Sequence, residues 1–178
     1  MRWRLFWFRM KCFVAHWWQA KGIYRAHSPR IFQLYRQVLH NKALPKDLVQ
    51  WRQALYKSRE PLTFNELGAG RDVKGAREIQ TTLGTLAKRS GAGAWKSRVL
   101  HQLVRHYQPQ SVLEFGTNVG IASGYMAKAL HKPAQLTTVE GVPELAAVAT
   151  RNLAQLGVDG RVLQVESTFD DFLDQLPA

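Results

Sequence analysis

The stretch SVLEFGTNVGIASGYMAKAL, residues 111–130, decides the fold that we expect for this chain of 178 residues. Its first five residues are short and apolar enough for a buried strand, and GIASGYMAKAL, residues 120–130, has the composition of a helix. Gly116 lies between the two, where a residue without a Cβ lets the backbone turn sharply. Such a glycine turn between a strand and a helix commonly holds a nucleotide-like ligand.

A second, similar phrase occurs earlier, TFNELGAGR at residues 63–71. The residues before its glycines form only a weakly apolar strand, and no strand that ends in an acid follows at the spacing of a nucleotide site. We expect GAGRDVKGAR, residues 68–77, to close a loop or a small hairpin. The turn at 114–120 is therefore the predicted ligand-binding turn.

Strands and helices alternate after residue 110, with short links between them. The predicted strands cover 111–115, 135–140 and 160–166, and the predicted helices cover 120–130, 143–157 and 168–176. This order predicts an α/β fold, a Rossmann-like parallel sheet that is incomplete at about three strands. Ligands of such sheets bind beyond the carboxyl ends of the strands.

The residues before this sheet are predicted to be mainly helical. Ser28 is a good N-cap and Pro29 a good first helical residue. The helices expected here cover 28–40, 45–60, 76–90 and 95–107. We therefore divide the chain into an N-terminal helix at 1–22, a helical region at 23–110 and a partial ligand-binding domain at 111–178.

Residues 1–20 are predicted to form a basic, aromatic, amphipathic helix. Charges interrupt its apolar runs too often for a secretory signal or a membrane span. One face collects large apolar side chains, namely Trp3, Phe6, Trp7, Met10, Phe13, Val14 and Trp17. This face either packs on protein, its own chain or a second copy, or lies on an anionic membrane surface.

Charge divides the chain unevenly. Residues 1–110 carry 21 lysines and arginines against 5 acids, whereas residues 111–178 carry 4 against 8. A basic region with interleaved aromatic residues also fits a nucleic-acid-binding protein with a degenerate cofactor fold, which is the alternative function. The single Cys12 fits a reducing, cytoplasmic setting, and the histidines do not cluster at metal-ligand spacing, so we expect no metal site.

Two ligand classes compete for the turn after residue 114. A dinucleotide loop reads G-x-G-x-x-G, but those positions hold Gly116, Asn118 and Ile121. Glu114 lies just before the turn, where a carboxylate suits a ligand that carries an ammonium group. Glu140 ends the next strand, where a carboxylate can accept both hydroxyls of a ribose. This pattern favours S-adenosylmethionine over NAD.

The segments VLEFGTNVGIASGYMAKAL and LTTVEGVPELAAVATRNLAQLG resemble the class I S-adenosylmethionine-dependent methyltransferases, and among them the small-molecule O-methyltransferases of a bacterial group. The resemblance covers about residues 20–176 and implies S-adenosylmethionine as cofactor and a small-molecule methyl acceptor. It places Glu114 and Gly116 near the methionine moiety and Glu140 on the ribose. The remaining implied contacts are Thr117 and Gly120 in the loop, and Thr168 and Phe169, after Ser167, at the adenine.

The family's sheet has seven strands, so we expect that this chain is shortened at its C-terminal end or that the remaining half is supplied elsewhere. The absent part holds the family's acidic motif near the methyl group and its general base or metal ligands. No catalytic residue is therefore assigned. An uncovered strand edge invites self-association. We expect a cytoplasmic protein in which residues 1–20 either pack on protein or contact a membrane surface.

Overall fold

The computed structural model describes residues 2–19, 28–66 and 77–176. The chain forms two compact units, residues 1–40 and residues 41–178. Three helical segments of the first unit are described, α1 (Arg2–Gln19), α2 (Pro29–Leu34) and the π-helical η2 (Tyr35–Leu39). Ser28 stands at the N-cap of α2 as predicted and Pro29 begins the helix, although the Ser28 side chain makes no capping hydrogen bond.

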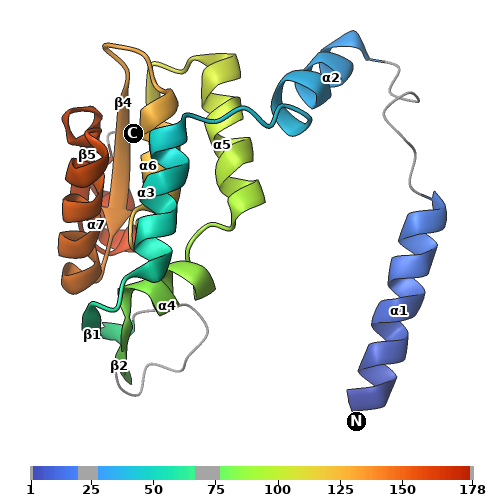
Figure 1. The fold of residues 1–178 in the computed structure, drawn as a ribbon, viewed down its shortest axis with the longest axis horizontal. Helices are drawn as coiled ribbons and strands as arrows, with labels where there is room; N and C mark the ends of the chain where they lie inside the picture. Colours follow the sequence, from blue (N-terminus) through green and yellow to red (C-terminus); the bar gives the residue numbers. More distant parts are fainter. Residues whose placement is uncertain (1, 20–27, 67–76, 177–178) are drawn as a thin grey trace. The chain divides into compact units, whose positions relative to one another are not determined.

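The second unit is built from helices around two small sheets (Figure 1). Its elements are α3 (Lys46–Lys57), β1 (Pro61–Glu66), β2 (Arg77–Thr82), α4 (Leu83–Arg89), α5 (Ala94–Tyr107), β3 (Ser111–Phe115), α6 (Ile121–Ala129), β4 (Gln135–Glu140), α7 (Pro143–Leu156), η3 (Asp159–Arg161), β5 (Val162–Glu166) and α8 (Phe169–Asp174). From β3 onward this order follows the predicted alternation of strands and helices.

The central sheet has three parallel strands in the order β3-β4-β5. Phe115 pairs with Val139, and Glu140 pairs with Glu166, so the carboxyl ends of the three strands lie at one edge. The prediction of an α/β, Rossmann-like parallel sheet with three strands is confirmed. The turn after β3, the end of β4 and the segment after β5 therefore share that edge.

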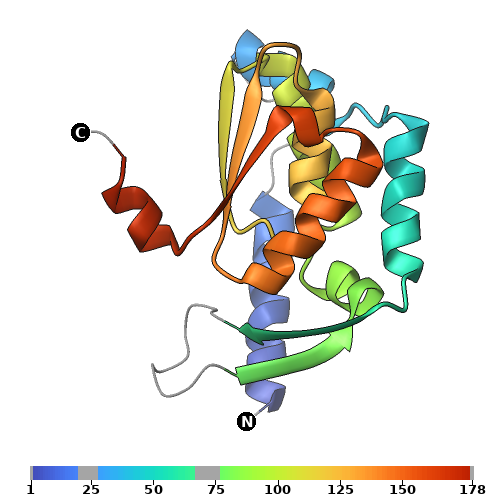
Figure 2. The ribbon, with the colours of Figure 1, turned by 90° about the vertical axis from the view of Figure 1, so that its left-hand side faces the viewer.

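Helices α6 and α7 cover one face of this sheet (Figure 2). The core between them is apolar, with Leu136 of β4 and Ile121 of α6 fully buried. The strands present every second residue to the other face, and on the two outer strands, β3 and β5, some of these side chains remain exposed. The large apolar side chains among them are Leu113, Phe115 and Leu163.

Helix α3 connects the helical region to the three-stranded sheet, because it packs against both α6 and α7, the helices that cover the sheet. The indole Nε1 of Trp51 donates a 2.9 Å hydrogen bond to the backbone carbonyl of Asn152 in α7. The side chain of Asn152 in turn donates to the carbonyl of Val119, in the turn after β3, at 2.9 Å. Residues 41–110 thus support the predicted ligand-binding turn from behind.

The helix predicted for residues 76–90 is wrong in its first half. Arg77–Thr82 form strand β2, antiparallel to β1, and only Leu83–Arg89 are helical. The strand places Ile79 opposite Phe64, which is buried, and this pairing prevails over helix propensity. The side chain of Thr82 accepts the Thr85 N–H at 3.3 Å and so begins the helix at that point.

We predict that Gly124→Ala destabilises the second unit by about 1–3 kcal/mol. A Cβ at this position in α6 would lie 2.7 Å from Cη2 of Trp51, whose ring is held by its bond to Asn152. Alanine forms helices better than glycine by about 1 kcal/mol, so propensity alone would make the variant more stable. A net loss of stability must therefore come from the overlap of the new Cβ with the Trp51 ring. Urea unfolding measures the change.

The control is Gly160→Ala, because a Cβ there meets nothing within 4 Å. We expect its free energy of unfolding to stay close to that of the unmodified chain. Equal stability of the two variants would contradict the close packing of Trp51 on α6.

Candidate cofactor-binding site

The turn between β3 and α6 is held in a conformation that suits glycine. The φ angles of Gly116, Asn118 and Gly120 are +90°, +52° and +83°. The Gly116 N–H donates to the carbonyl of Val139 in β4 at 2.8 Å, and the Gly120 N–H donates to that of Thr117 at 2.9 Å. Asn118, which stands where a dinucleotide loop would have its second glycine, takes a left-handed position that asparagine tolerates better than most residues.

Glu140 connects the end of β4 to this turn. Its Oε2 accepts the Asn118 N–H at 2.7 Å, and its Oε1 accepts the Val142 N–H at 3.0 Å. The side chain is only 8% exposed. The structure therefore brings the predicted acid and the predicted turn into direct contact, across 22 residues of sequence.

Glu114 lies under the turn in a cage of hydroxyl groups. Its Oε2 accepts hydrogen bonds from Ser123 Oγ at 2.5 Å and from Thr138 Oγ1 at 2.8 Å. Thr138 Oγ1 is also 2.6 Å from Thr117 Oγ1. Both carboxylate bonds end on the same oxygen.

The environment of Glu114 favours its neutral form. Burial raises the pKa of the carboxyl above its ordinary value, the hydroxyls of Ser123 and Thr138 lower it by donating to the charged form, and the negative charge of Glu140 raises it again. Burial is the largest of these effects. A bound cation would oppose it by stabilising the carboxylate.

Thr168 and Phe169 follow β5 at the same edge of the sheet. Thr168 caps α8, because its Oγ1 accepts the Asp171 N–H at 3.2 Å and lies 2.6 Å from Asp171 Oδ2. The ring of Phe169 packs edge-on against Phe115, with centroids 5.2 Å apart. A Cβ on Gly116 would lie 3.7 Å from Phe169 Cζ, so this ring stands over the glycine of the turn.

Sequence reasoning missed two residues that position Glu114. Ser123 and Thr138 are both fully buried, on α6 and β4, and both donate to the same carboxylate oxygen. The signal that was available is a hydroxyl residue between Leu136 and Glu140 on the inward-facing positions of the strand, and another hydroxyl residue three positions after Gly120 in the helix. Their spacing alone does not reveal that they share a partner.

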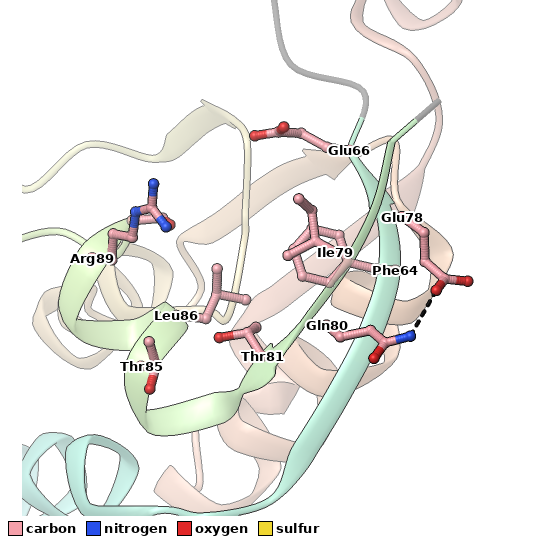
Figure 3. Close-up of a pocket in the computed structure, with 10 residues that line it drawn as sticks. Phe64, Glu66, Glu78, Ile79, Gln80, Thr81, Thr85, Leu86 and Arg89 are labelled. Carbon is pink, nitrogen blue, oxygen red and sulfur yellow. Dashed lines mark hydrogen bonds between the residues drawn. The ribbon is translucent and has the colours of Figure 1, made fainter. Parts of the chain in front are cut away.

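The strands that flank the first glycine phrase line a hollow of their own. These strands make the hairpin β1-β2, while the glycines of the phrase, in residues 67–76, lie outside the described residues, as does most of the loop predicted there. A hollow of about 310 Å³ lies between the hairpin and α4 (Figure 3). Its lining is Phe64, Glu66, Glu78, Ile79, Gln80, Thr81, Thr85, Leu86, Arg89 and Ser90.

This hollow is separate from the turn after β3, since no residue of 114–120 lines it. Phe64 and Leu86 are buried and give it an apolar part, while Gln80 Nε2 donates to Glu78 Oε1 at 2.8 Å on the outer side (Figure 3). The two similar phrases of the sequence therefore belong to two different sheets.

We predict that the stability difference between Glu114→Gln and the unmodified chain depends on pH. The pKa of the Glu114 carboxyl is higher in the folded than in the unfolded chain. Between the ordinary pKa of 4.5 and the raised one, folding is therefore accompanied by the uptake of a proton. The unmodified chain should lose stability relative to the variant as the pH rises through the raised pKa. Urea unfolding between about pH 4 and pH 8 measures this.

Glu144→Gln, at an exposed carboxylate in the first turn of α7, controls for the loss of one acid elsewhere. A constant difference between Glu114→Gln and the unmodified chain at every pH would contradict the burial of a titrating carboxyl.

Known proteins resemble the part of the chain that holds this site. No protein-family model matches the chain. It is 31% identical over 84 residues to catechol O-methyltransferase B of Danio rerio, a match that covers 47% of this chain and 32% of the relative. It is 35% identical over 81 residues to a catechol O-methyltransferase of Niastella koreensis, covering 46% and 37%. The matches thus span about a third of the length of these curated relatives.

A solved structure shares the fold. The O-methyltransferase of Bacillus cereus, described in complex with SAH, superimposes with a TM-score of 0.53 at 18% identity, over 80% of this chain and 52% of that one. The structural similarity supports the assignment of the fold, and the sequence matches support the similarity to O-methyltransferases. Over about half of its length the chain is thus similar in sequence to catechol O-methyltransferases, and it shares the fold of an O-methyltransferase of known structure.

Proposed function

We propose that residues 41–178 are the S-adenosylmethionine-binding part of an enzyme that transfers a methyl group to a hydroxyl of a small molecule. The observation that carries this proposal is the turn at 116–120, held against the carboxylate of Glu140 at the carboxyl edge of a parallel sheet. The names of the matched relatives, catechol O-methyltransferases, support an oxygen acceptor and a small one.

The residues present fit this cofactor. Gly116 has no side chain where a ligand would approach, and its φ of +90° disfavours any other residue. The ring of Phe169 lies on that same side, 3.7 Å from where a Cβ of Gly116 would be, and gives an apolar wall beside the backbone of the turn. A flat base or a thioether chain would bind against such a wall.

Each predicted contact has a chemical reason. Both bonds of Glu114 use Oε2, so we propose that Oε1 accepts the ammonium group of the methionine moiety. We propose that Glu140 binds the ribose hydroxyls with lone pairs that remain after its two backbone bonds. Thr117 and Gly120 line the turn, and Thr168 and Phe169 contact the adenine.

The reaction that this arrangement serves is a displacement at carbon. When bound, S-adenosylmethionine would supply a methyl group on a sulfonium, which an acceptor oxygen would displace with the electron pair of the carbon–sulfur bond going to sulfur. The acceptor's proton leaves to a base that none of the assigned residues supplies. These residues would contribute to the reaction by orienting the bound cofactor, so that its methyl group faces the acceptor.

Other contacts of the chain are proposals of the same kind. We propose a cytoplasmic protein that touches a membrane surface through residues 1–20, and self-association through an exposed strand edge of the three-stranded sheet. Nucleic-acid binding, the alternative, rests on the basic composition of residues 1–110 and gains nothing from the geometry at Glu140.

Isothermal titration of the whole chain should show binding of S-adenosylmethionine and of its demethylated product, and no binding of NAD. The reason is the missing second and third glycines of a dinucleotide loop, replaced by Asn118 and Ile121. Binding of NAD with no response to S-adenosylmethionine would overturn the proposed function.

Glu140→Ala should weaken S-adenosylmethionine binding by about 1.5–3 kcal/mol, the size of a lost hydrogen bond to a charged group. The same titration measures it. Glu78→Ala, at an exposed strand carboxylate in the hairpin, is the matched control and should bind as the unmodified chain does. Circular dichroism confirms that both variants fold. An unchanged dissociation constant in folded Glu140→Ala would show that this acid serves the turn alone.

A further inference from the structure

Helix α1 presents a broad apolar surface. At about 100° per residue, eight side chains occupy roughly 140° of its circumference without a polar residue between them. We call this surface the aromatic arc. Its members, in order around the helix, are Phe13, Phe6, Trp17, Met10, Trp3, Val14, Trp7 and Trp18.

The aromatic arc is exposed to solvent in the structure. Trp3, Trp17 and Trp18 are 76%, 70% and 82% exposed. Burying one such ring is worth about 1.5–3 kcal/mol, so leaving eight large apolar groups in water is costly. All four tryptophans of α1 lie in this arc, and tryptophan is the residue that prefers the boundary between lipid and water.

Cations border the aromatic arc on both sides. Arg9 lies beyond the Phe13 edge, and Lys11 and Arg4 lie beyond the Trp18 edge. Their long side chains can reach outward along the helix surface while the arc between them is buried. Acids are missing from this part of the sequence altogether, since the first one in the chain is Asp47.

We propose that α1 lies flat in the interface of a membrane that contains anionic phospholipid, with the aromatic arc among the acyl chains and Arg4, Arg9 and Lys11 on the phosphates. In this orientation the aromatic arc contacts lipid and the opposite, more polar side of the helix contacts water. It does not cross the bilayer, because no helix in the described residues is long and apolar enough to do so. The inference stands independently of the proposed methyl transfer.

The charges of α1 favour an anionic membrane over two other binding partners, a second copy of α1 and nucleic acid. Two copies of α1 packed arc to arc would bring cations against cations along both borders, in either direction, because the helix has no acid to pair with them. Nucleic acid would satisfy Arg4, Arg9 and Lys11 but would leave most of the arc in water. An anionic membrane satisfies the cations and the arc together.

The chain offers a matched pair of substitutions. Phe6 lies in the aromatic arc and Phe8 lies on the opposite side, and both are well exposed, at 56% and 65%. Phe6→Ser should weaken binding to vesicles of phosphatidylcholine with phosphatidylglycerol roughly tenfold or more. Phe8→Ser should leave that binding within about twofold, because its ring faces the water.

A second variant tests the cations. Replacing Arg4, Arg9 and Lys11 together by Gln should weaken binding to the anionic vesicles roughly a hundredfold. Vesicles of phosphatidylcholine alone should bind the unmodified chain weakly. Circular dichroism on each variant establishes that α1 is still helical.

Co-sedimentation of the whole chain with the two kinds of vesicle gives the measurement, and quenching of tryptophan fluorescence by brominated lipid reports whether the arc enters the bilayer. Equal losses for Phe6→Ser and Phe8→Ser, equal binding to both vesicles, or no quenching would each overturn the proposal. So would failure to bind either vesicle, whether the chain then binds RNA or sediments as a dimer that Phe6→Ser dissociates.

Discussion

The candidate site depends on the two hydrogen bonds that the carboxylate of Glu140 accepts from the backbone. One of its oxygens holds the N–H of Asn118 and the other holds that of Val142, so one side chain fixes the turn after β3 and the start of the segment before α7. Without an acceptor at that place, two backbone donors at the carboxyl edge of the sheet would lose their partner, which is costly in a buried setting. The acid is thus structural before it meets any ligand.

The turn is also held from the opposite side by the helical region. Trp51 binds the backbone of Asn152, and Asn152 binds the carbonyl of Val119 at the end of the turn. This chain of bonds explains why residues 41–110 share one compact unit with the sheet, although their sequence has a different texture and a different charge. Rigid support of this kind is what a binding loop needs, because a loop that is ordered in advance loses less entropy on binding.

The two glycine phrases show how far local pattern can be trusted. Both place glycine after a short strand, but only the strand before Gly116 enters a parallel sheet whose next strand ends in an acid. The strand before the other phrase pairs with residues 77–82, in a segment whose composition had predicted a helix. Cross-strand packing of Phe64 on Ile79 decided that segment, and such a pair cannot be seen in a periodicity.

The sequence by itself determined the alternation of strands and helices after residue 110, the glycine turn and the acid at the end of β4, because each depends on residues that are close along the chain. It also determined the aromatic arc of α1, since a helix places every residue by its position alone. Only the tertiary structure decided that Ser123 and Thr138 share one oxygen of Glu114, and that Phe169 stands over Gly116. These contacts join separate elements, and their geometry is set by packing, which no local pattern contains.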